Sequence, residues 1–244
     1  TVKKEFVNMT ENMAKNITED IRQMLFELRD EKYRAFQEKL KPSASPVIGV
    51  RSAELRKTAK ELAKGCWREY VSALNSSSYY EERTAAGMSI YYAKTDIGER
   101  MEYTDIFLPF IDGWAVCDGV CATIRLKKDE RDRFWEYAVK KVLSGEEFVS
   151  RFGLVAILHD FVDEEHINGI FDIIERINYA GFYDSVGAAW LLAECMTKLP
   201  ERTFEYMRVS RLNDMVYNKA IQKMRESYRV SPEIKNELKR MTRA

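Results

Sequence analysis

Residues 147–208 decide the expected fold: EFVSRFGLVAILHDFVDEEHINGIFDIIERINYAGFYDSVGAAWLLAECMTKLPERTFEYMR. Apolar residues recur in this stretch every three to four positions, which is the spacing of one face of an α-helix. The pattern predicts two pairs of helices, 147–160 with 164–177 and 183–198 with 200–208. The stretch is therefore typical of a repeated two-helix unit.

The same arrangement extends towards the amino terminus, where we expect helices at 80–94, 99–108, 114–124 and 130–143. Each pair begins 33 to 36 residues after the previous one. Two-helix units of this length bury their apolar faces only when they stack on their neighbours. We therefore predict an all-α solenoid of HEAT- or armadillo-like repeats with a concave groove. It forms one domain over residues 1–244, with an additional helix at residues 1–17.

Helix boundaries upstream follow from capping residues and one loop. Asp30 is the expected N-cap of a helix with its apolar face at Tyr33, Phe36 and Leu40. The stretch Pro42-Ser-Ala-Ser-Pro46 then predicts a loop.

We expect Ser52 to cap the helix that follows this loop. Asp112 is the expected N-cap of the helix that begins near Trp114.

Composition places the chain among globular proteins, because 45% of its 244 residues are hydrophobic and 32% are charged. The first residues, TVKKEF, are polar and charged where a signal peptide would be apolar. No run of about 18 apolar residues suggests a membrane span. We expect a soluble, cytoplasmic protein that does not bind membranes.

The four cysteines, Cys66, Cys117, Cys121 and Cys195, form no CxxC pair. The two histidines, His159 and His166, do not bring them to a spacing typical of zinc ligands. We interpret the cysteines as reduced core thiols and expect neither a metal nor another cofactor.

The net charge is zero, with 39 basic and 39 acidic residues, but the charges are unevenly distributed. Residues 198–244 contain 12 Lys and Arg against 6 Asp and Glu, which leaves the rest of the chain acidic. A basic segment of this kind suits contacts with nucleic-acid phosphates. A solvated helix face explains it equally well.

Three sites on successive repeats draw attention: Trp114-Ala-Val-Cys-Asp118, Arg151 and Trp190. Trp114 and Asp118 are four residues apart and therefore share one helix face. All three sites fall on the first helix of a predicted pair, and equivalent helices of a solenoid line the same side. We therefore expect a composite site of two indoles, one carboxylate and one guanidinium.

At this point the chain resembles the DNA alkylation repair glycosylases of the AlkD-like, HEAT-repeat family, over about residues 20–240. The segment Ile48-Gly-Val-Arg-Ser-Ala-Glu-Leu-Arg56 is similar to a family motif that has proline where this chain has Ala53. Further similar elements, in the family's order, are Trp114–Asp118, Arg151 before an apolar run, Ala188-Ala-Trp190-Leu-Leu192 and the closing helix 218–228.

The resemblance implies excision of N3- or N7-alkylated purines from double-stranded DNA, without a cofactor and by a monomer. Asp118 would stabilise positive charge on the deoxyribose, and Trp114 and Trp190 would offer their indole faces to it. Arg151 would hold a backbone phosphate. Further implied or candidate DNA contacts are Arg51, Ser52, Lys219, Lys223 and Arg229.

A second hypothesis stays open: a non-catalytic HEAT-repeat protein that binds nucleic acid or protein through its concave face. It treats the tryptophans as core residues, Asp118 as a solvated side chain, and Arg151 as the partner of Glu146 or Glu147. A sugar hydrolase with two carboxylates is less favoured, because no second acid accompanies Asp118.

Overall fold

The computed structural model describes residues 16–243 and is all-helical, with no β-strand in that range beyond one isolated bridge between Arg29 and Val50. The additional helix predicted at 1–17 lies almost entirely outside the described residues. The chain divides into two compact units, Thr1–Arg125 and Leu126–Ala244, and each is described by itself. The single repeat domain expected over residues 1–244 stays a prediction.

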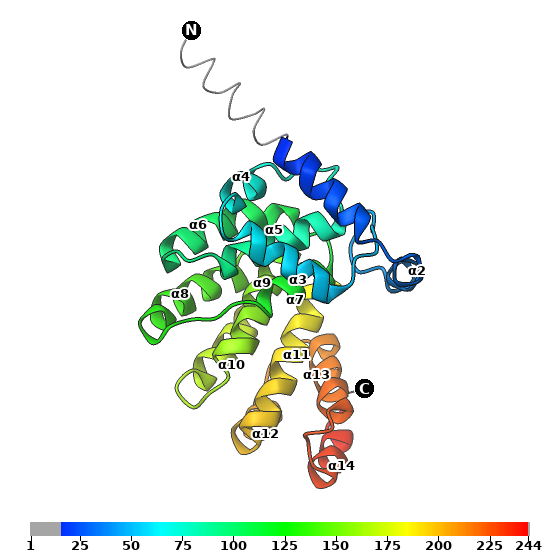
Figure 1. Ribbon diagram of the computed structural model, residues 1–244. Helices are drawn as coiled ribbons and strands as arrows, with labels where there is room; N and C mark the ends of the chain where they lie inside the picture. Colours follow the sequence, from blue (N-terminus) through cyan, green and yellow to red (C-terminus); the bar gives the residue numbers. More distant parts are fainter. Residues whose placement is uncertain (1–15, 244) are drawn as a thin grey trace. The chain divides into compact units, whose positions relative to one another are not determined.

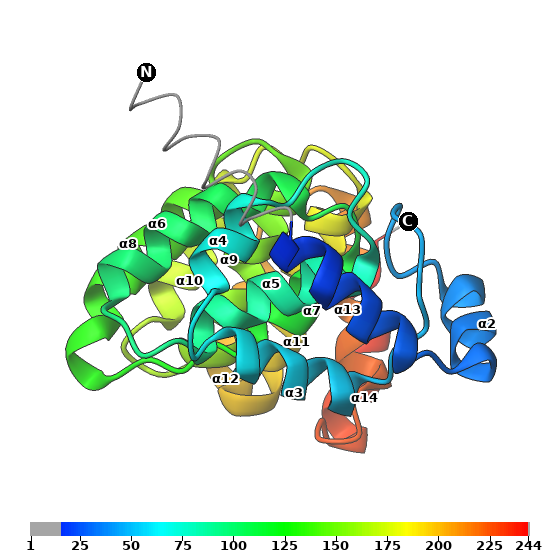
Figure 2. The same cartoon turned by 45° about the horizontal axis from the view of Figure 1, so that its top comes forward.

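The first unit contains a helix at 16–27 followed by seven further elements (Figure 1). They are α2 Glu31–Leu40, α3 Ser52–Leu62, α4 Trp67–Ser72, α5 Tyr80–Tyr92, α6 Ile97–Phe107, the 3-10 turn η1 Leu108–Phe110, and α7 Trp114–Cys121. Helix α5 contacts both α3 and α7, while α4 and α6 pack on each other and on α5. Figure 2 shows α3 alongside α5.

The second unit repeats this alternation. Its elements are η2 Lys128–Glu130, α8 Arg131–Val142, α9 Glu147–Asp160, α10 Ile167–Arg176, α11 Phe182–Lys198, α12 Pro200–Val209, α13 Asp214–Glu226 and α14 Pro232–Arg240. Helix α11 packs between α9 and α13, and Figure 1 shows α11 beside α13. Every second helix therefore forms a row in each unit: α3, α5 and α7 in the first, and α9, α11 and α13 in the second.

The middle helix of each row is buried on nearly all sides, which explains its small residues. In α5 the run Ala85-Ala86-Gly87 lets the neighbouring helices approach, and α11 uses Ala188 and Ala189 in the same way. Large side chains such as Phe134 and Phe152 are fully buried between the helices. Each contributes roughly 1.5–3 kcal/mol to stability by leaving water.

The predicted pairs of helices agree with the structure to within three residues at their ends, from α5 through α12. Asp30 caps α2 as expected, because its carboxylate accepts a hydrogen bond from the Tyr33 amide at 2.9 Å. None of the four cysteines forms a disulfide; Cys117, Cys121 and Cys195 are buried and Cys66 is half-buried. Among the helices of residues 16–243, none has the length and apolar character needed to cross a membrane.

Candidate functional site

Trp114 and Asp118 lie one turn apart on α7, and both side chains line a pocket of about 340 Å³ in the first unit. Both residues are half-buried. Asp118 is the only acid and Arg56 the only cation among the lining residues. The pocket is completed by Tyr33, Phe36, Gln37, Leu40, Pro42, Ser52, Leu55, Tyr80, Thr84, Met88, Ala115, Gly119 and Ala122. One carboxylate therefore faces a mostly aromatic and aliphatic wall.

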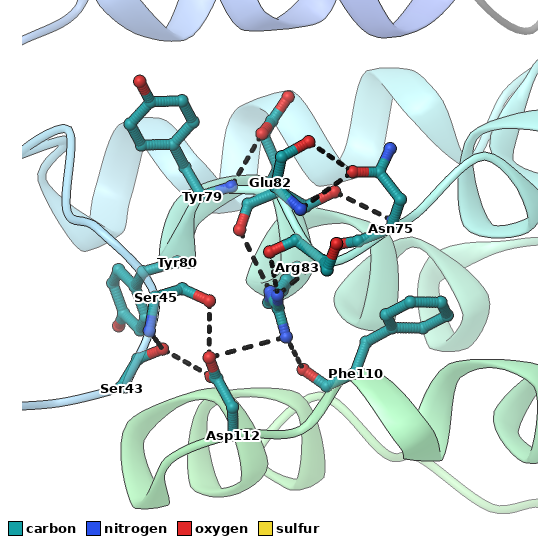
Figure 3. Close-up of polar contacts among 12 residues, drawn as sticks. Ser43, Ser45, Asn75, Tyr79, Tyr80, Glu82, Arg83, Phe110 and Asp112 are labelled. Carbon is teal, nitrogen blue, oxygen red and sulfur yellow. Dashed lines mark hydrogen bonds and ion pairs between the residues drawn. The ribbon is translucent and has the colours of Figure 1, made fainter.

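The start of α7 is held by Asp112, in the network that Figure 3 shows. The Asp112 carboxylate accepts hydrogen bonds from the hydroxyls of Ser43 and Ser45, and it pairs with Arg83 Nη1 at 3.4 Å. The predicted cap is wrong: Gly113, not Asp112, is the N-cap. Asp112 instead anchors the loop at 42–46 against the helix that carries Trp114.

Gly113 is needed because the loop and α7 approach very closely. A Cβ atom at this position would lie 2.3 Å from the carbonyl oxygen of Pro42. The same carbonyl accepts a hydrogen bond from the Ala115 amide at 3.1 Å, and the Ala44 amide donates to the Asp112 carbonyl at 3.1 Å. The pocket wall at Pro42 is thus fixed directly to the first turn of α7.

A second buried carboxylate, Glu81, fixes the chain that leads into α3. It is 0% exposed and accepts hydrogen bonds from the amides of Ile48, Gly49 and Val50 at 2.8, 2.7 and 3.2 Å. Burial raises the pKa of Glu81 above its usual value, against these three hydrogen bonds, which lower it. Gly49 has φ +101°, and a Cβ there would lie 2.5 Å from Arg34 Cβ.

Arg51 and Ser52, two predicted DNA contacts, follow this turn. Arg51 pairs with Asp30 at 2.7 Å, yet its side chain remains 62% exposed. The predicted cap at Ser52 is wrong, since Ser52 is the first residue of α3 and Arg51 is the N-cap. The Ser52 hydroxyl is instead 3.4 Å from the hydroxyl of Tyr33, and Ser52 lines the Trp114 pocket.

Trp190 lies on α11 in the second unit and lines another pocket, of about 250 Å³. The His159 ring meets its indole edge-to-face, with centroids 6.3 Å apart. One turn beyond Trp190, Glu194 forms two hydrogen bonds to the Arg229 guanidinium, at 2.5 and 3.2 Å. Trp190 and Glu194 thus repeat the four-residue spacing of Trp114 and Asp118.

Arg151 is buried on α9, at 4% exposure. Its Nη1 donates a hydrogen bond to the Tyr183 carbonyl at 2.8 Å, while Glu147 accepts one from the Tyr183 amide at 2.6 Å. Arg151 and Glu147 therefore hold the same residue at the start of α11. A contact between Arg151 and DNA stays a prediction.

Lys219 and Lys223, the two lysines predicted to contact DNA, lie on α13 and differ in whether a nearby carboxylate compensates their charge. Lys219 donates to Gln222 at 2.9 Å, whereas Lys223 pairs with Glu226 at 3.2 Å and lines the Trp190 pocket. Trp114, Asp118, Ser52 and Arg56 share a pocket of the first unit. Trp190, Lys223 and Arg229 share one of the second.

Sequence reasoning missed Glu81, Arg83 and Glu194, which hold these pockets in place, and it gave Asp112 the different role of an N-cap. Only Glu194 carried a readable signal, the repeat of the tryptophan–acid spacing. For the others the partners are 29 or more residues away, or are backbone groups, and no local pattern reveals them. Within residues 16–243, no group of His, Cys, Asp or Glu side chains is arranged to hold a metal ion.

Over residues 16–243 the protein is all-helical, and in each unit an indole and at least one carboxylate line the same pocket. The sequence profile of the DNA alkylation repair enzyme family matches residues 21–224, and the chain belongs to this family. Its role thus lies in DNA alkylation repair, with DNA as the substrate. No curated protein and no solved structure matches the chain.

Proposed function

We propose that this protein is a DNA glycosylase that excises N3- or N7-alkylated purines from double-stranded DNA. The observation that carries the proposal is the pocket in which Asp118 is the only carboxylate and Trp114 forms part of an aromatic wall. A single fixed negative charge beside π faces suits a transition state with positive charge on a sugar. Membership of the repair family supports DNA as the source of that sugar.

The chemistry is hydrolysis of the bond between C1′ of the deoxyribose and the base nitrogen. Alkylation at N3 or N7 makes the purine cationic, so the base leaves as a neutral molecule when it takes the bonding electron pair. Asp118 stabilises the developing oxocarbenium ion and orients a water molecule, whose oxygen bonds to C1′ while its proton passes to the carboxylate or solvent. Trp114 adds roughly 0.5–2 kcal/mol of cation–π attraction.

We propose that the paired helices within each unit are HEAT-like repeats, while a single solenoid with a concave groove stays a prediction from the sequence. The 33- to 36-residue period of the helix pairs supports this arrangement. We propose Trp190 as a second indole that contacts the lesion, and the following residues as contacts to the DNA backbone: Arg151, Arg51, Ser52, Lys219 and Lys223. The protein would act as a monomer.

The alternative is a non-catalytic HEAT-repeat protein that binds nucleic acid or protein. One observation favours it: the net charge is zero, whereas duplex-binding proteins gain affinity from excess positive charge. It requires no ionised carboxylate at position 118. The two functions are therefore separated by one conservative substitution.

The test is release of 7-methylguanine from methylated duplex DNA at low salt by wild type, Asp118→Asn and Asp105→Asn. Asp105 is an exposed residue of α6 outside the pocket and serves as the matched control. Removing the charge at Asp118 should lower the rate by about 10²-fold or more, as loss of one preorganised electrostatic group does. D105N should match wild type.

Two results refute the proposal. If the wild type releases no methylated base, the glycosylase function is wrong and the binding protein is favoured. If D118N releases base as fast as D105N does, the carboxylate has no catalytic role.

A further inference from the structure

A second pocket of the first unit, of about 590 Å³, lies where the carboxyl ends of α3 and α5 meet the start of α4. Four of its eight lining residues are cations, and none is an acid. The lining residues are Lys60, Ala63, Lys64, Gly65, Trp67, Arg68, Tyr92 and Lys94. In a chain of zero net charge, this is a local concentration of positive charge.

The cations are partly held in place by aromatic rings. Lys60 Nζ lies 5.3 Å from the Tyr92 ring centroid, and the Arg68 guanidinium lies 4.4 Å from that of Trp67. Arg68 is also fixed by two hydrogen bonds to Glu99, at 2.7 and 2.8 Å. Its position is thus preorganised.

The remaining charges have little local compensation. Within residues 16–243, Lys60 and Lys94 have no carboxylate at ion-pair distance, and both residues are exposed. Lys64 pairs with Glu61 at 2.7 Å, but both side chains are about 70% exposed, so water weakens the pair.

Helix dipoles explain only part of this arrangement. Lys60 lies in the last turn of α3, where a cation is favoured by the partial negative charge of the helix end. Arg68 is in the first turn of α4, where the dipole disfavours a cation. Lys94 lies beyond the end of α5. The Glu99 carboxylate accounts for the position of Arg68, whereas an anionic ligand would compensate Lys60 and Lys94.

Helix α3 connects this pocket with the one that contains Asp118. Arg56 and Lys60 are four residues apart on α3 and so share a helix face, and Lys64 follows just after the helix ends at Leu62. Arg56 lines the Asp118 pocket, and the two lysines line the basic pocket. From Arg56 to Lys60 the helix rises about 6 Å, at 1.5 Å per residue. That is roughly the axial rise of two phosphate steps in one DNA strand.

We infer that the basic pocket binds phosphate groups of a nucleic-acid strand, and that this strand continues along α3 from the Asp118 pocket. Phosphate binding in the basic pocket does not depend on whether the protein is a glycosylase. The path of the strand from the Asp118 pocket does rest on the proposed function. Trp67 and Tyr92 make the pocket suitable for a nucleotide, whose sugar and base add apolar area to the phosphate. The same phosphate chemistry is offered by a free mononucleotide, which the experiment includes.

The experiment compares binding of a fluorescein-labelled, undamaged duplex by wild type, Lys60→Glu/Lys94→Glu and Lys32→Glu/Lys57→Glu over a range of salt concentrations. The control pair is exposed, lies on α2 and α3 outside both pockets, and changes the net charge equally. K60E/K94E should weaken binding at least about tenfold at low salt. It should also reduce the slope of log K against log salt by about 0.9 for each lost phosphate contact.

The inference is overturned if K60E/K94E and K32E/K57E have the same affinity and salt slope. Far-UV circular dichroism melts check that each variant folds. Lys60→Ala/Lys94→Ala, which introduces no new charge, replaces the first variant if K60E/K94E does not fold. A loss of melting temperature without any loss of binding assigns the cations to helix stability and also overturns the inference.

Deoxyadenosine monophosphate and inorganic phosphate are titrated by calorimetry in a second arm. If the mononucleotide binds through Lys60 and Lys94 while duplex binding is unchanged, the strand path along α3 is wrong. The outcome is independent of the base-release assay. If the wild type binds duplex DNA through this pocket but releases no base, only the proposed glycosylase activity is refuted. If the protein releases base without needing Lys60 and Lys94, only the proposed phosphate binding in this pocket is refuted.

Discussion

Replacing Glu81 by Gln should destabilise the protein although the two side chains have the same shape. The Glu81 carboxylate accepts three backbone hydrogen bonds, two on Oε1 and one on Oε2. Glutamine keeps one acceptor oxygen, for Gly49 and Val50, and turns an NH₂ group towards the Ile48 amide. The buried Ile48 N–H then faces another hydrogen-bond donor and has no acceptor.

The magnitude follows from that single lost acceptor. A buried donor left unpaired costs about 1–3 kcal/mol. At about 2–4 °C per kcal/mol for a chain of this size, the melting temperature should fall by roughly 2–12 °C. The turn at Gly49 also positions Ser52 and the start of α3, so the wall of the Asp118 pocket should loosen and base release should decline.

The assay is urea unfolding followed by far-UV circular dichroism for wild type, Glu81→Gln and Glu61→Gln. Glu61 is the matched control because its side chain is 69% exposed and makes only a surface pair with Lys64. Its loss should cost less than about 1 kcal/mol. Equal unfolding free energies for E81Q and E61Q would refute the idea that Glu81 fixes this turn.

Two further predictions concern acid stability and thiol reactivity. The Tyr33 amide and the Arg51 guanidinium lower the pKa of Asp30 below its ordinary value of 3.8, so the stabilisation it supplies is present above that value and disappears as pH falls through the lower folded pKa. The Asp30→Asn variant keeps a good N-cap residue but loses the ion pair with Arg51. The unfolding free energies of this variant and of wild type should therefore converge in acid. A constant difference between the two free energies down to the lowest pH would contradict this. Burial raises the pKa of the Cys195 thiol, so little of the reactive thiolate forms there. In the folded protein a disulfide reagent should label the half-buried Cys66 first and Cys195 only on unfolding. Rapid labelling of Cys195 in the native state would contradict this and show that α11 opens readily.

Local periodicity was sufficient for the helices and for the pairing of Trp114 with Asp118. The helices from α5 to α12 were predicted with small end errors because each buries an apolar stripe with a period of about 3.6 residues. Trp114 and Asp118 share a face because four residues make about one turn of helix. These properties depend only on near neighbours in the chain.

Capping was less predictable than helix position. The prediction that Asp30 is an N-cap was confirmed, but the predicted N-caps Ser52 and Asp112 were wrong. Both were placed at the right helix ends, yet their side chains bind partners from elsewhere in the chain. A serine or aspartate near a helix start therefore indicates the start and not which hydrogen bond it makes.

The sequence by itself determined an all-helical chain of paired helices and one helix face that presents an indole and a carboxylate together. Tertiary structure decided what surrounds that face, since Glu81 and Asp112 reach more than 30 residues along the chain to hold the pocket wall. It also buried Arg151 against Tyr183 and brought Lys60 and Lys94 into one basic pocket. Helix periodicity is a local property, whereas burial and long-range pairing exist only once distant segments have packed.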